Sequence, residues 1–192
     1  MDALVERLAL PAGDASWGDS LRRPFEELAA GDPSALESVW EIAGRRLYAL
    51  ALWRTGNAED ARDVVQDVFV RLASRSNALS RVEAPHVWLL AVAHRAAVDL
   101  TRRRAVRRTE PLEAAGMVEA RGGDPERAVE AARLSEALAK LPEAQREAVS
   151  LRHLLGCSFR EVAEITGVPT FTAASRCRLG LSRLRRLLEE PR

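Results

Sequence analysis

The sequence predicts an all-α protein built from two small helical domains joined by a flexible linker. Apolar residues recur at helical spacing in several segments, whereas the alternation of β-branched residues expected of strands is almost absent. Prolines stand at the expected first position of several helices. Between two groups of helical segments lies a stretch that holds a proline and three glycines without sustained periodicity, which is typical of a linker.

These signals divide the chain into four parts. Its 192 residues correspond to between one and two domains at about 150 residues each. Residues 1–19 form a loose N-terminal extension, and residues 20–105 form the first domain. Residues 106–123 are the linker, and residues 124–192 form the second domain.

The composition excludes several classes of protein. An apolar content of 47% excludes a disordered chain, and a net charge of +1 excludes a uniformly polycationic nucleic-acid coat. Lys140 is the only lysine, so the basic charge is almost wholly arginine. Arginine is suited to phosphate and carboxylate partners because its planar fork binds two oxygens at once.

The chain shows no sign of export or membrane insertion. Two cysteines, Cys157 and Cys177, are too few for a disulfide framework. The N-terminus lacks the basic-then-apolar order of a signal peptide, and no apolar run approaches the roughly 20 residues of a spanning helix. We therefore expect a cytoplasmic protein.

Five local signals mark helix starts. A proline at the first helical position is expected at Asp32-Pro33, Ala84-Pro85, Asp124-Pro125 and Leu141-Pro142. Asn57 is expected to cap a helix that runs from Ala58 to about Ser74. Each signal fixes the start of a helix before any tertiary contact is considered.

The helix from Ala58 to Ser74 has two different faces. Its apolar stripe consists of Ala61, Val65, Val68 and Leu72. The remaining positions combine acidic and apolar side chains, which suits another protein better than DNA. A solvated face without a partner is an equally good interpretation of the residues alone.

The helix that begins at Pro85 ends in a cluster of arginines. Residues 101–108 hold five arginines. Cations complement the dipole at a helix C-terminus, but five in eight residues exceed what a cap requires. Phosphate binding is the preferred interpretation, because releasing counterions from a nucleic acid rewards such clusters.

Near the C-terminus the sequence predicts a helix-turn-helix. Ser158 and Glu161 form a capping box before a short helix, and Gly167 ends it. Val168 must be extended because it precedes Pro169, and Thr170 is then expected to cap a long helix that runs to about Leu188. DNA binding through the second helix is expected, the alternative being an ordinary helical hairpin with a solvated face.

Other conspicuous residues are assigned to packing. Trp40, Trp53 and Trp88 fall within apolar stripes and are expected in the core. His153 and Cys157 lie one helical turn apart, but a metal site needs more ligands than these. The sequence offers no candidate catalytic residue, cofactor site or metal site.

Three segments together resemble the extracytoplasmic-function (ECF) sigma factors of bacterial RNA polymerase. Residues 58–72 look like their core-polymerase-binding helix, and residues 88–100 with the arginine run look like their promoter-melting and minus-ten-reading segment. Residues 141–148 and 158–175 are similar to their minus-thirty-five-binding domain. The resemblance spans residues 21–188 and implies a region 2 bundle followed by a region 4 helix-turn-helix.

The resemblance implies three groups of site residues. The surface for core polymerase would comprise Asp63, Gln66, Asp67, Phe69 and Arg71. The minus-ten element would be handled by the loop from Ser74 to Pro85 and by His94, Arg95 and Asp99, with Arg102, Arg103 and Arg104 on the duplex backbone. The upstream element would meet Arg160, Thr172, Ser175, Arg176 and Arg178.

Four positions depart from the usual family pattern. Arg95 stands where an asparagine is usual, and Phe171, Ala173 and Ala174 replace a small residue, a β-branched residue and a lysine. We expect Phe171 to fold back onto the preceding helix as an apolar staple, the alternative being contact with a thymine methyl.

The expected function is that of a non-enzymatic sigma factor that directs RNA polymerase to promoters. Its partners would be core polymerase and promoter DNA, and the resemblance also implies an anti-sigma factor; the free protein is expected to be a monomer. The alternative of a different class is a stand-alone helix-turn-helix repressor whose first domain dimerises or senses a ligand. A metal-dependent or nucleic-acid-cleaving enzyme is a third option, for which no acid–histidine constellation stands near the arginines.

Overall fold

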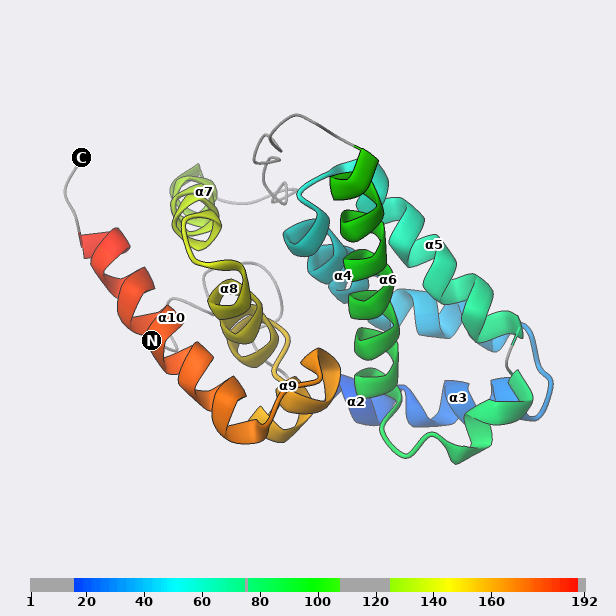
Figure 1. Ribbon diagram of the computed structural model, residues 1–192. Helices are drawn as coiled ribbons and strands as arrows, with labels where there is room; N and C mark the ends of the chain where they lie inside the picture. Colours follow the sequence, from blue (N-terminus) through cyan, green and yellow to red (C-terminus); the bar gives the residue numbers. More distant parts are fainter. Residues whose placement is uncertain (1–15, 75, 108–124, 190–192) are drawn as a thin grey trace. The chain divides into compact units, whose positions relative to one another are not determined.

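A computed structural model describes residues 16–74, 76–107 and 125–189 (Figure 1). Most of these residues are helical and none of them lies in a strand, which confirms the all-α prediction. They fall into two compact units, residues 16–107 and residues 125–189. Each unit is described by itself.

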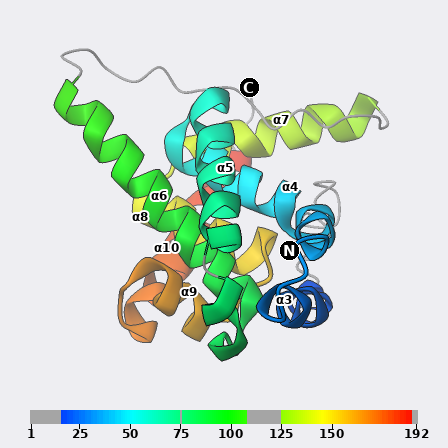
Figure 2. The same ribbon diagram turned by 90° about the vertical axis from the view of Figure 1, so that its right-hand side faces the viewer.

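The first unit is a bundle around three long helices. Its elements are α2 (Trp17–Ser20), α3 (Arg22–Ala29), α4 (Ala35–Thr55), α5 (Ala58–Ser74), the 3₁₀ helix η1 (Ser76–Arg81) and α6 (Pro85–Arg107). Helix α4 packs against α5 and α6, which also pack against each other, as both views show (Figures 1 and 2). The short helix α3 covers η1.

The core of this bundle is formed by stripes on the three long helices. The predicted stripe of α5 is confirmed, since Ala61, Val65, Val68 and Leu72 are all buried. They meet apolar side chains of α4 and α6 that are also buried, among them Val39, Leu47, Leu89 and Ala93. Removing this apolar surface from water is the main force that holds the three helices together.

The structure corrects the end of the predicted N-terminal extension. Residues 1–15 lie outside the described part of the chain, but residues 17–19 belong to α2, and Trp17 is buried. The Trp17 ring meets the His86 ring edge-on with 5.5 Å between centroids, and the Arg46 guanidinium lies 5.0 Å from the Trp17 centroid. Burial of so large an aromatic side chain outweighs the ordering of one short turn.

The predicted helix starts are confirmed at two prolines and displaced at two others. Pro85 and Pro125 are the first residues of α6 and α7. Helix α4 begins at Ala35 rather than Pro33, because Asp32 Oδ1 accepts hydrogen bonds from the Ser34 N–H at 2.9 Å and from its hydroxyl at 2.7 Å. Helix α8 begins at Glu143, one residue after Pro142, whose backbone is extended.

Little of the predicted linker falls within the described residues. Its first two positions, 106 and 107, are the last two residues of α6. The remainder, 108–123, lies outside the described part of the chain. The linker assignment for those positions stays a prediction.

The second unit contains the helix-turn-helix. Its elements are α7 (Pro125–Ala139), α8 (Glu143–Val149), the π-helical turn η2 (Ser150–Leu154), α9 (Phe159–Thr166) and α10 (Thr170–Glu189). Helix α10 packs against α7, α8 and α9. Its inward stripe of Ala173, Cys177, Gly180 and Leu184 is buried.

The π turn η2 continues α8 without a break. The N–H of Leu155 donates to the carbonyl of Ser150 at 3.0 Å, five residues back rather than four. The wider turn lets α8 and η2 run into the loop before α9 while Leu151, Leu154 and Leu155 remain buried.

Across the described ranges, none of the helices combines the length and the apolar character needed to span a membrane.

Candidate functional site

The start of α5 is fixed by local hydrogen bonds, as its sequence predicts. Asn57 Oδ1 accepts from the N–H groups of Glu59 at 2.9 Å and Asp60 at 3.1 Å. These are donors that the first turn of a helix leaves unpaired, so Asn57 is the N-cap. The cap sets the register in which α5 presents its outer face.

The outer face of α5 presents the predicted polymerase-binding residues. Asp63 and Gln66 are exposed, and Asp67 pairs with Arg71 through an Oδ2–Nη2 distance of 2.8 Å. Both members of this pair remain substantially exposed, and exposed pairs contribute little to folding stability. Their charges are therefore accessible to another molecule. Whether they bind polymerase stays a prediction.

An aromatic pair borders this face and corrects the prediction for Trp40. The sequence places Trp40 in the core, but it is 55% exposed, and its ring meets that of Phe69 edge-on at 5.2 Å between centroids. Trp53 and Trp88 are half-buried. The signal was present in the sequence: Trp40 lies one position off the buried stripe of Val39 and Ala43, and so faces outward.

Val70 extends the same surface. It is an exposed large apolar residue on α5, directly after Phe69. Together Trp40, Phe69, Val70, Asp63 and Asp67 form what we call the α4–α5 face. Aromatic residues surrounded by charges are typical of a protein-binding surface.

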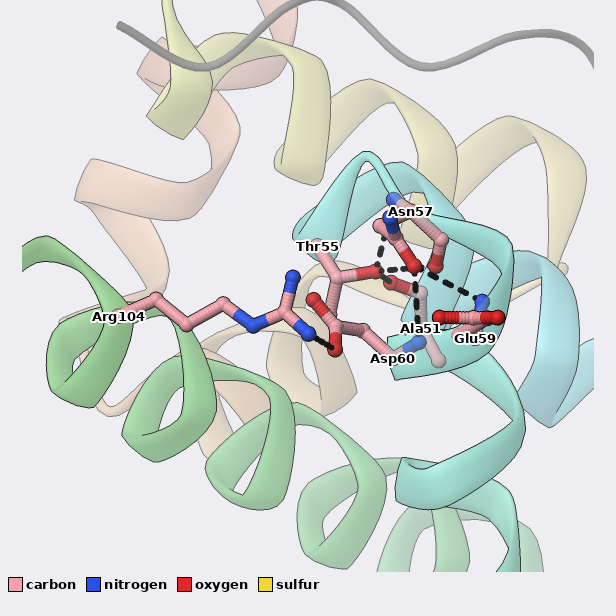
Figure 3. Close-up of polar contacts among 6 residues, drawn as sticks. All are labelled: Ala51, Thr55, Asn57, Glu59, Asp60 and Arg104. Carbon is pink, nitrogen blue, oxygen red and sulfur yellow. Dashed lines mark hydrogen bonds and ion pairs between the residues drawn. The ribbon is translucent and has the colours of Figure 1, made fainter. Parts of the chain in front are cut away.

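The arginine cluster at the end of α6 divides between two faces of the helix. Arg102 and Arg103 are exposed, as predicted. Arg104 was predicted to hold the DNA backbone, but its guanidinium is ion-paired with the buried carboxylate of Asp60 (Figure 3). Arg104 continues the inward stripe of Ala93 and Ala97, which is why its side chain reaches α5.

Asp60 is the buried partner in this pair. It is 1% exposed, and burial raises the pKa of its carboxyl above the ordinary value, against the attraction of Arg104, which lowers it. The sequence predicted a favourable first-turn acid at this position and placed it on the acidic outer face of the helix, which the burial of Asp60 corrects. Its role in joining two helices depends on a residue that is far away in the sequence.

His94 lies on the buried side of α6 and is only 8% exposed. Its predicted contact with the unpaired minus-ten strand stays a prediction. Arg95 and Asp99 are exposed, one turn apart, and Arg102 follows on the same side. Arg95 Nε donates to the Ala91 carbonyl at 3.0 Å, which holds the side chain along the helix. The predicted loop before α6 contains η1, and its residue 75 lies outside the described residues.

The helix-turn-helix has the local geometry that the sequence predicts. The Glu161 N–H donates to Ser158 Oγ at 3.2 Å, and the Ser158 N–H donates to Glu161 Oε2 at 2.6 Å, which completes the capping box. Gly167 ends α9 with φ of +70°, a left-handed conformation that favours glycine. Helix α10 begins at Thr170 itself, so the residue predicted as its cap is the first helical residue.

The predicted upstream-element residues differ in accessibility. Arg160 and Arg178 are exposed, while Thr172, Ser175 and Arg176 are half-buried. Phe171 does not fold back as a staple, because it is 80% exposed. Ala173, at the same helix start, is fully buried and is not available to a groove.

Next to these residues lies a basic groove that the sequence did not reveal. It has a volume of about 560 Å³ and is lined by apolar residues, including Phe159 and Leu181, and by four arginines, Arg152, Arg178, Arg185 and Arg186. The Arg152 guanidinium lies 5.0 Å from the Phe159 centroid and donates to the Cys157 carbonyl at 2.9 Å. The regular spacing of Arg178 and Arg185 along α10 was the available signal, but Arg152 comes from another element.

The two cysteines are buried packing residues. Burial raises the pKa of the Cys157 thiol to about 12 and also raises the pKa of the Cys177 thiol. Neither thiol is poised to ionise near neutral pH. Within the described part of the chain, no three or more His, Cys, Asp or Glu side chains gather in a way that could hold a metal ion.

Comparison with known protein families identifies both units. A model described as Sigma-70 region 2 matches residues 40–107, and one described as Sigma-70, region 4 matches residues 131–184. The first match contains the α4–α5 face and α6, and the second contains the helix-turn-helix.

Full-length relatives and solved structures are similar over most of the chain. The ECF RNA polymerase sigma factor SigM of Mycobacterium tuberculosis is 33% identical over 159 residues, which cover 83% of this chain and 80% of the relative. SigE of Mycolicibacterium smegmatis, also an ECF RNA polymerase sigma factor, is 33% identical over 183 residues, covering 90% of this chain and 71% of SigE. The sigma factor RpoE of Bartonella quintana, solved with the anti-sigma factor NepR, has a TM-score of 0.69 at 23% identity, covering 81% of this chain and 98% of RpoE. CnrH, solved with the cytosolic domain of CnrY, has a TM-score of 0.63 at 25% identity, covering 89% and 98%.

Proposed function

The chain belongs to the ECF family of RNA polymerase sigma factors, and we propose that its two units divide the work of promoter recognition between them. The first unit binds core polymerase and captures the minus-ten region, while the second fixes the upstream element. The observation that carries this division is the presence of different exposed chemistry on each unit: acidic and aromatic on α4–α5, basic on the helix-turn-helix.

The α4–α5 face is the proposed surface for core polymerase. Asp63, Gln66 and Asp67 supply polar groups, and Trp40 with Phe69 supplies an aromatic contact at the edge. A partly exposed tryptophan beside charges is the kind of residue that dominates binding energy when a partner removes it from water. Arg71 supports the face through its pair with Asp67.

The exposed side of α6 is the proposed contact for the minus-ten region. Arg95, Asp99, Arg102 and Arg103 lie within reach of one another along two turns of helix. Arginine can stack on unpaired bases and also bind phosphates, so this side suits a strand that leaves the duplex. The negative charge of Asp99 would repel a phosphate at its own position. Contacts to bases and contacts to the DNA backbone would then lie at different places along α6.

The second unit is proposed to dock α10 in the major groove. Arg160, Thr172, Ser175, Arg176 and Arg178 would meet the upstream element, with Phe171 projecting ahead of them. An exposed phenylalanine at the start of such a helix suits a thymine methyl group. The basic groove would continue the contact along the phosphate backbone, because four arginines line it.

Because a linker joins the two units, two weak DNA contacts combine into a stronger one. Once one unit is bound, the other faces its own DNA element at a high effective concentration. Neither promoter contact then needs high affinity by itself.

Partners and location follow from the same assignment. We propose core polymerase and promoter DNA as partners, with an anti-sigma factor as inhibitor, the class of protein bound to B. quintana RpoE. We also propose that the free chain is monomeric, non-enzymatic and cytoplasmic. These properties are those of an initiation factor that acts only through polymerase.

Run-off transcription tests the proposal directly. Purified chain and core polymerase are incubated with a library of promoters whose two elements are randomised. We expect transcripts only when the chain is present, and the enriched templates should share one upstream and one start-proximal motif. A stand-alone repressor would give no transcripts and would not change the elution of core polymerase on gel filtration.

A further inference from the structure

One ion pair joins the beginning of α5 to the end of α6. Arg104 extends from α6 toward Asp60, and its Nη2 pairs with Asp60 Oδ1 (Figure 3). The Asp60 carboxylate is almost fully buried, whereas Arg104 is partly exposed. The pair therefore lies at the boundary between the core and the arginine cluster.

Hydrogen bonds also hold the backbone around Asp60 in place. Asn57 Oδ1 accepts from the Asp60 N–H at 3.1 Å. The Thr55 hydroxyl donates to the Ala51 carbonyl at 2.9 Å and accepts from the Asn57 N–H at 3.3 Å (Figure 3). The chain of contacts thus runs from the end of α4, through the start of α5, to the end of α6.

The ion pair gives Arg104 a different environment from that of Arg102 and Arg103, the two arginines before it. Arg104 faces inward with its charge balanced by Asp60, while Arg102 and Arg103 face solvent. A guanidinium fork is suited to a carboxylate because it fixes direction as well as distance. Buried ion pairs usually add little net stability, and their attested use is to select one arrangement over others.

From this geometry we propose that Asp60 is a positioning residue for promoter binding: through Arg104 it sets the direction of the last turns of α6, so that Arg102 and Arg103 meet the DNA backbone. The proposal rests on the proposed function, because it assumes that α6 contacts DNA. It reassigns Arg104 from a phosphate-binding residue to the support of two neighbouring ones.

Two explanations of the ion pair predict opposite effects of Asp60→Asn on the affinity for DNA. If Asp60 merely neutralises Arg104, Asp60→Asn releases a positive charge, and DNA binding becomes tighter with a steeper salt dependence. If Asp60 positions α6, the same substitution loosens the helix end, and DNA binding becomes weaker although a negative charge has been removed.

The experiment measures promoter binding by holoenzyme, assembled from the full chain and core polymerase, over a series of salt concentrations. The variants are Asp60→Asn, Arg104→Gln, both together, and Arg104→Lys. Arg103→Gln is the matched control for a direct phosphate contact and should lower the salt slope by about one. Binding to core polymerase is measured for every variant, so that promoter affinity is compared at equal occupancy.

We expect Asp60→Asn and Arg104→Gln each to weaken promoter binding about five-fold, which is within the range by which residues that do not touch a ligand change its affinity. The double variant should be no weaker than the worse single one, because both substitutions remove the same interaction. Arg104→Lys should recover part of the loss. Promoter binding by Asp60→Asn that is equal to or tighter than that of the wild type, with a steeper salt slope, would overturn the proposal.

Amide hydrogen exchange of the free chain provides a second, independent measurement. Asp60→Asn should speed exchange at residues 100–104 and leave the middle of α6 unchanged. Unchanged exchange at the helix end would also overturn the proposal. If Arg103→Gln has no effect on the promoter, the DNA-binding role of α6 is at fault instead, and the exchange result still decides whether Asp60 holds the helix end.

Discussion

Gly180 and Val149 meet where α10 crosses α8. A Cβ atom on Gly180 would lie 2.7 Å from Val149 Cγ2 and 3.1 Å from the carbonyl oxygen of Gln145. The first neighbour is a short branched side chain and the second is helix backbone, so neither can move far. The close approach of these two helices sets the position of α10, and with it the helix-turn-helix.

Gly180→Ala should therefore destabilise the protein, although alanine is the better helix former by about 1 kcal/mol. We expect a net loss of about 1–2 kcal/mol in the free energy of unfolding, because inserting a methyl group into a packed crossing forces backbone shifts. Urea unfolding followed by circular dichroism measures it. Ser182→Ala, at an exposed position of the same helix, is the control and should be neutral or slightly stabilising; equal behaviour of the two variants would contradict the packing argument.

Asp67→Arg should weaken binding to core polymerase by about 2 kcal/mol or more, since it reverses a charge at the proposed interface and repels Arg71. Helicity should be unchanged because the Asp67–Arg71 pair is exposed. Fluorescence titration with core polymerase measures the affinity. The control is Asp19→Arg, an exposed reversal in the same unit, and undiminished binding of Asp67→Arg would count against the α4–α5 face.

Trp40→Ala and Trp17→Ala should separate binding from folding. Trp17 is buried, so its removal should lower the free energy of unfolding by about 3–5 kcal/mol. Trp40 is mostly exposed in the free protein, so its removal should cost little stability but about 2 kcal/mol of polymerase affinity. Thermal unfolding and the same titration measure the two effects. A large loss of stability in Trp40→Ala with normal affinity would place Trp40 in the folding core after all.

Ala174→Lys should strengthen DNA binding by the full chain and steepen its salt dependence by about one unit. Ala174 lines the basic groove beside Arg178, so a lysine there adds a charge to a surface proposed to follow the phosphate backbone. Leu179→Lys adds the same charge on another side of α10 and should have a smaller effect. If both variants share one salt slope, residue 174 does not face the backbone.

The stability contributed by Asp60 should fall as the pH rises. Burial raises the pKa of its carboxyl above the ordinary 3.8, so the folded protein binds this proton more tightly than the unfolded chain does. The contribution is thus largest below pH 3.8 and is lost between 3.8 and the raised pKa. Asp60→Asn does not titrate, so its free energy of unfolding relative to the wild type should rise across this window. Urea unfolding at a series of pH values tests this. If the stability of Asp60→Asn relative to the wild type fell as the pH rose, the pKa of Asp60 would be lowered and not raised.

The features that the sequence predicted correctly are those that depend on residues close together in the chain. The Asn57 cap, the Ser158–Glu161 capping box and the turn at Gly167 each depend on a few neighbouring residues, and each is found in the structure. These residue types at this spacing are typical of helix caps and helix ends, so the sequence alone indicates them. For the same reason the apolar stripe of α5 was predictable residue by residue.

The site was predictable only in outline, because its details depend on contacts between distant elements. A run of three arginines does not show that Arg104 meets Asp60, since that depends on how α5 and α6 pack. The exposure of Trp40 depends on a shift of one position relative to the buried stripe of α4. The burial of Trp17 depends on His86 and Arg46, which come from other helices.

The π turn at Ser150–Leu154 marks one place where the second unit can lose a residue and keep its fold. A π turn accommodates one residue more than an α turn, so deleting a residue within it would restore a regular helix. The side chains before and after the turn would keep their directions relative to one another, because the wider turn had absorbed the extra residue. If the residue lost were Arg152, the basic groove would lose one of its four arginines while the caps and the glycine turn stayed as they are. A family member shortened in this way would keep the fold yet present a different charge pattern to DNA.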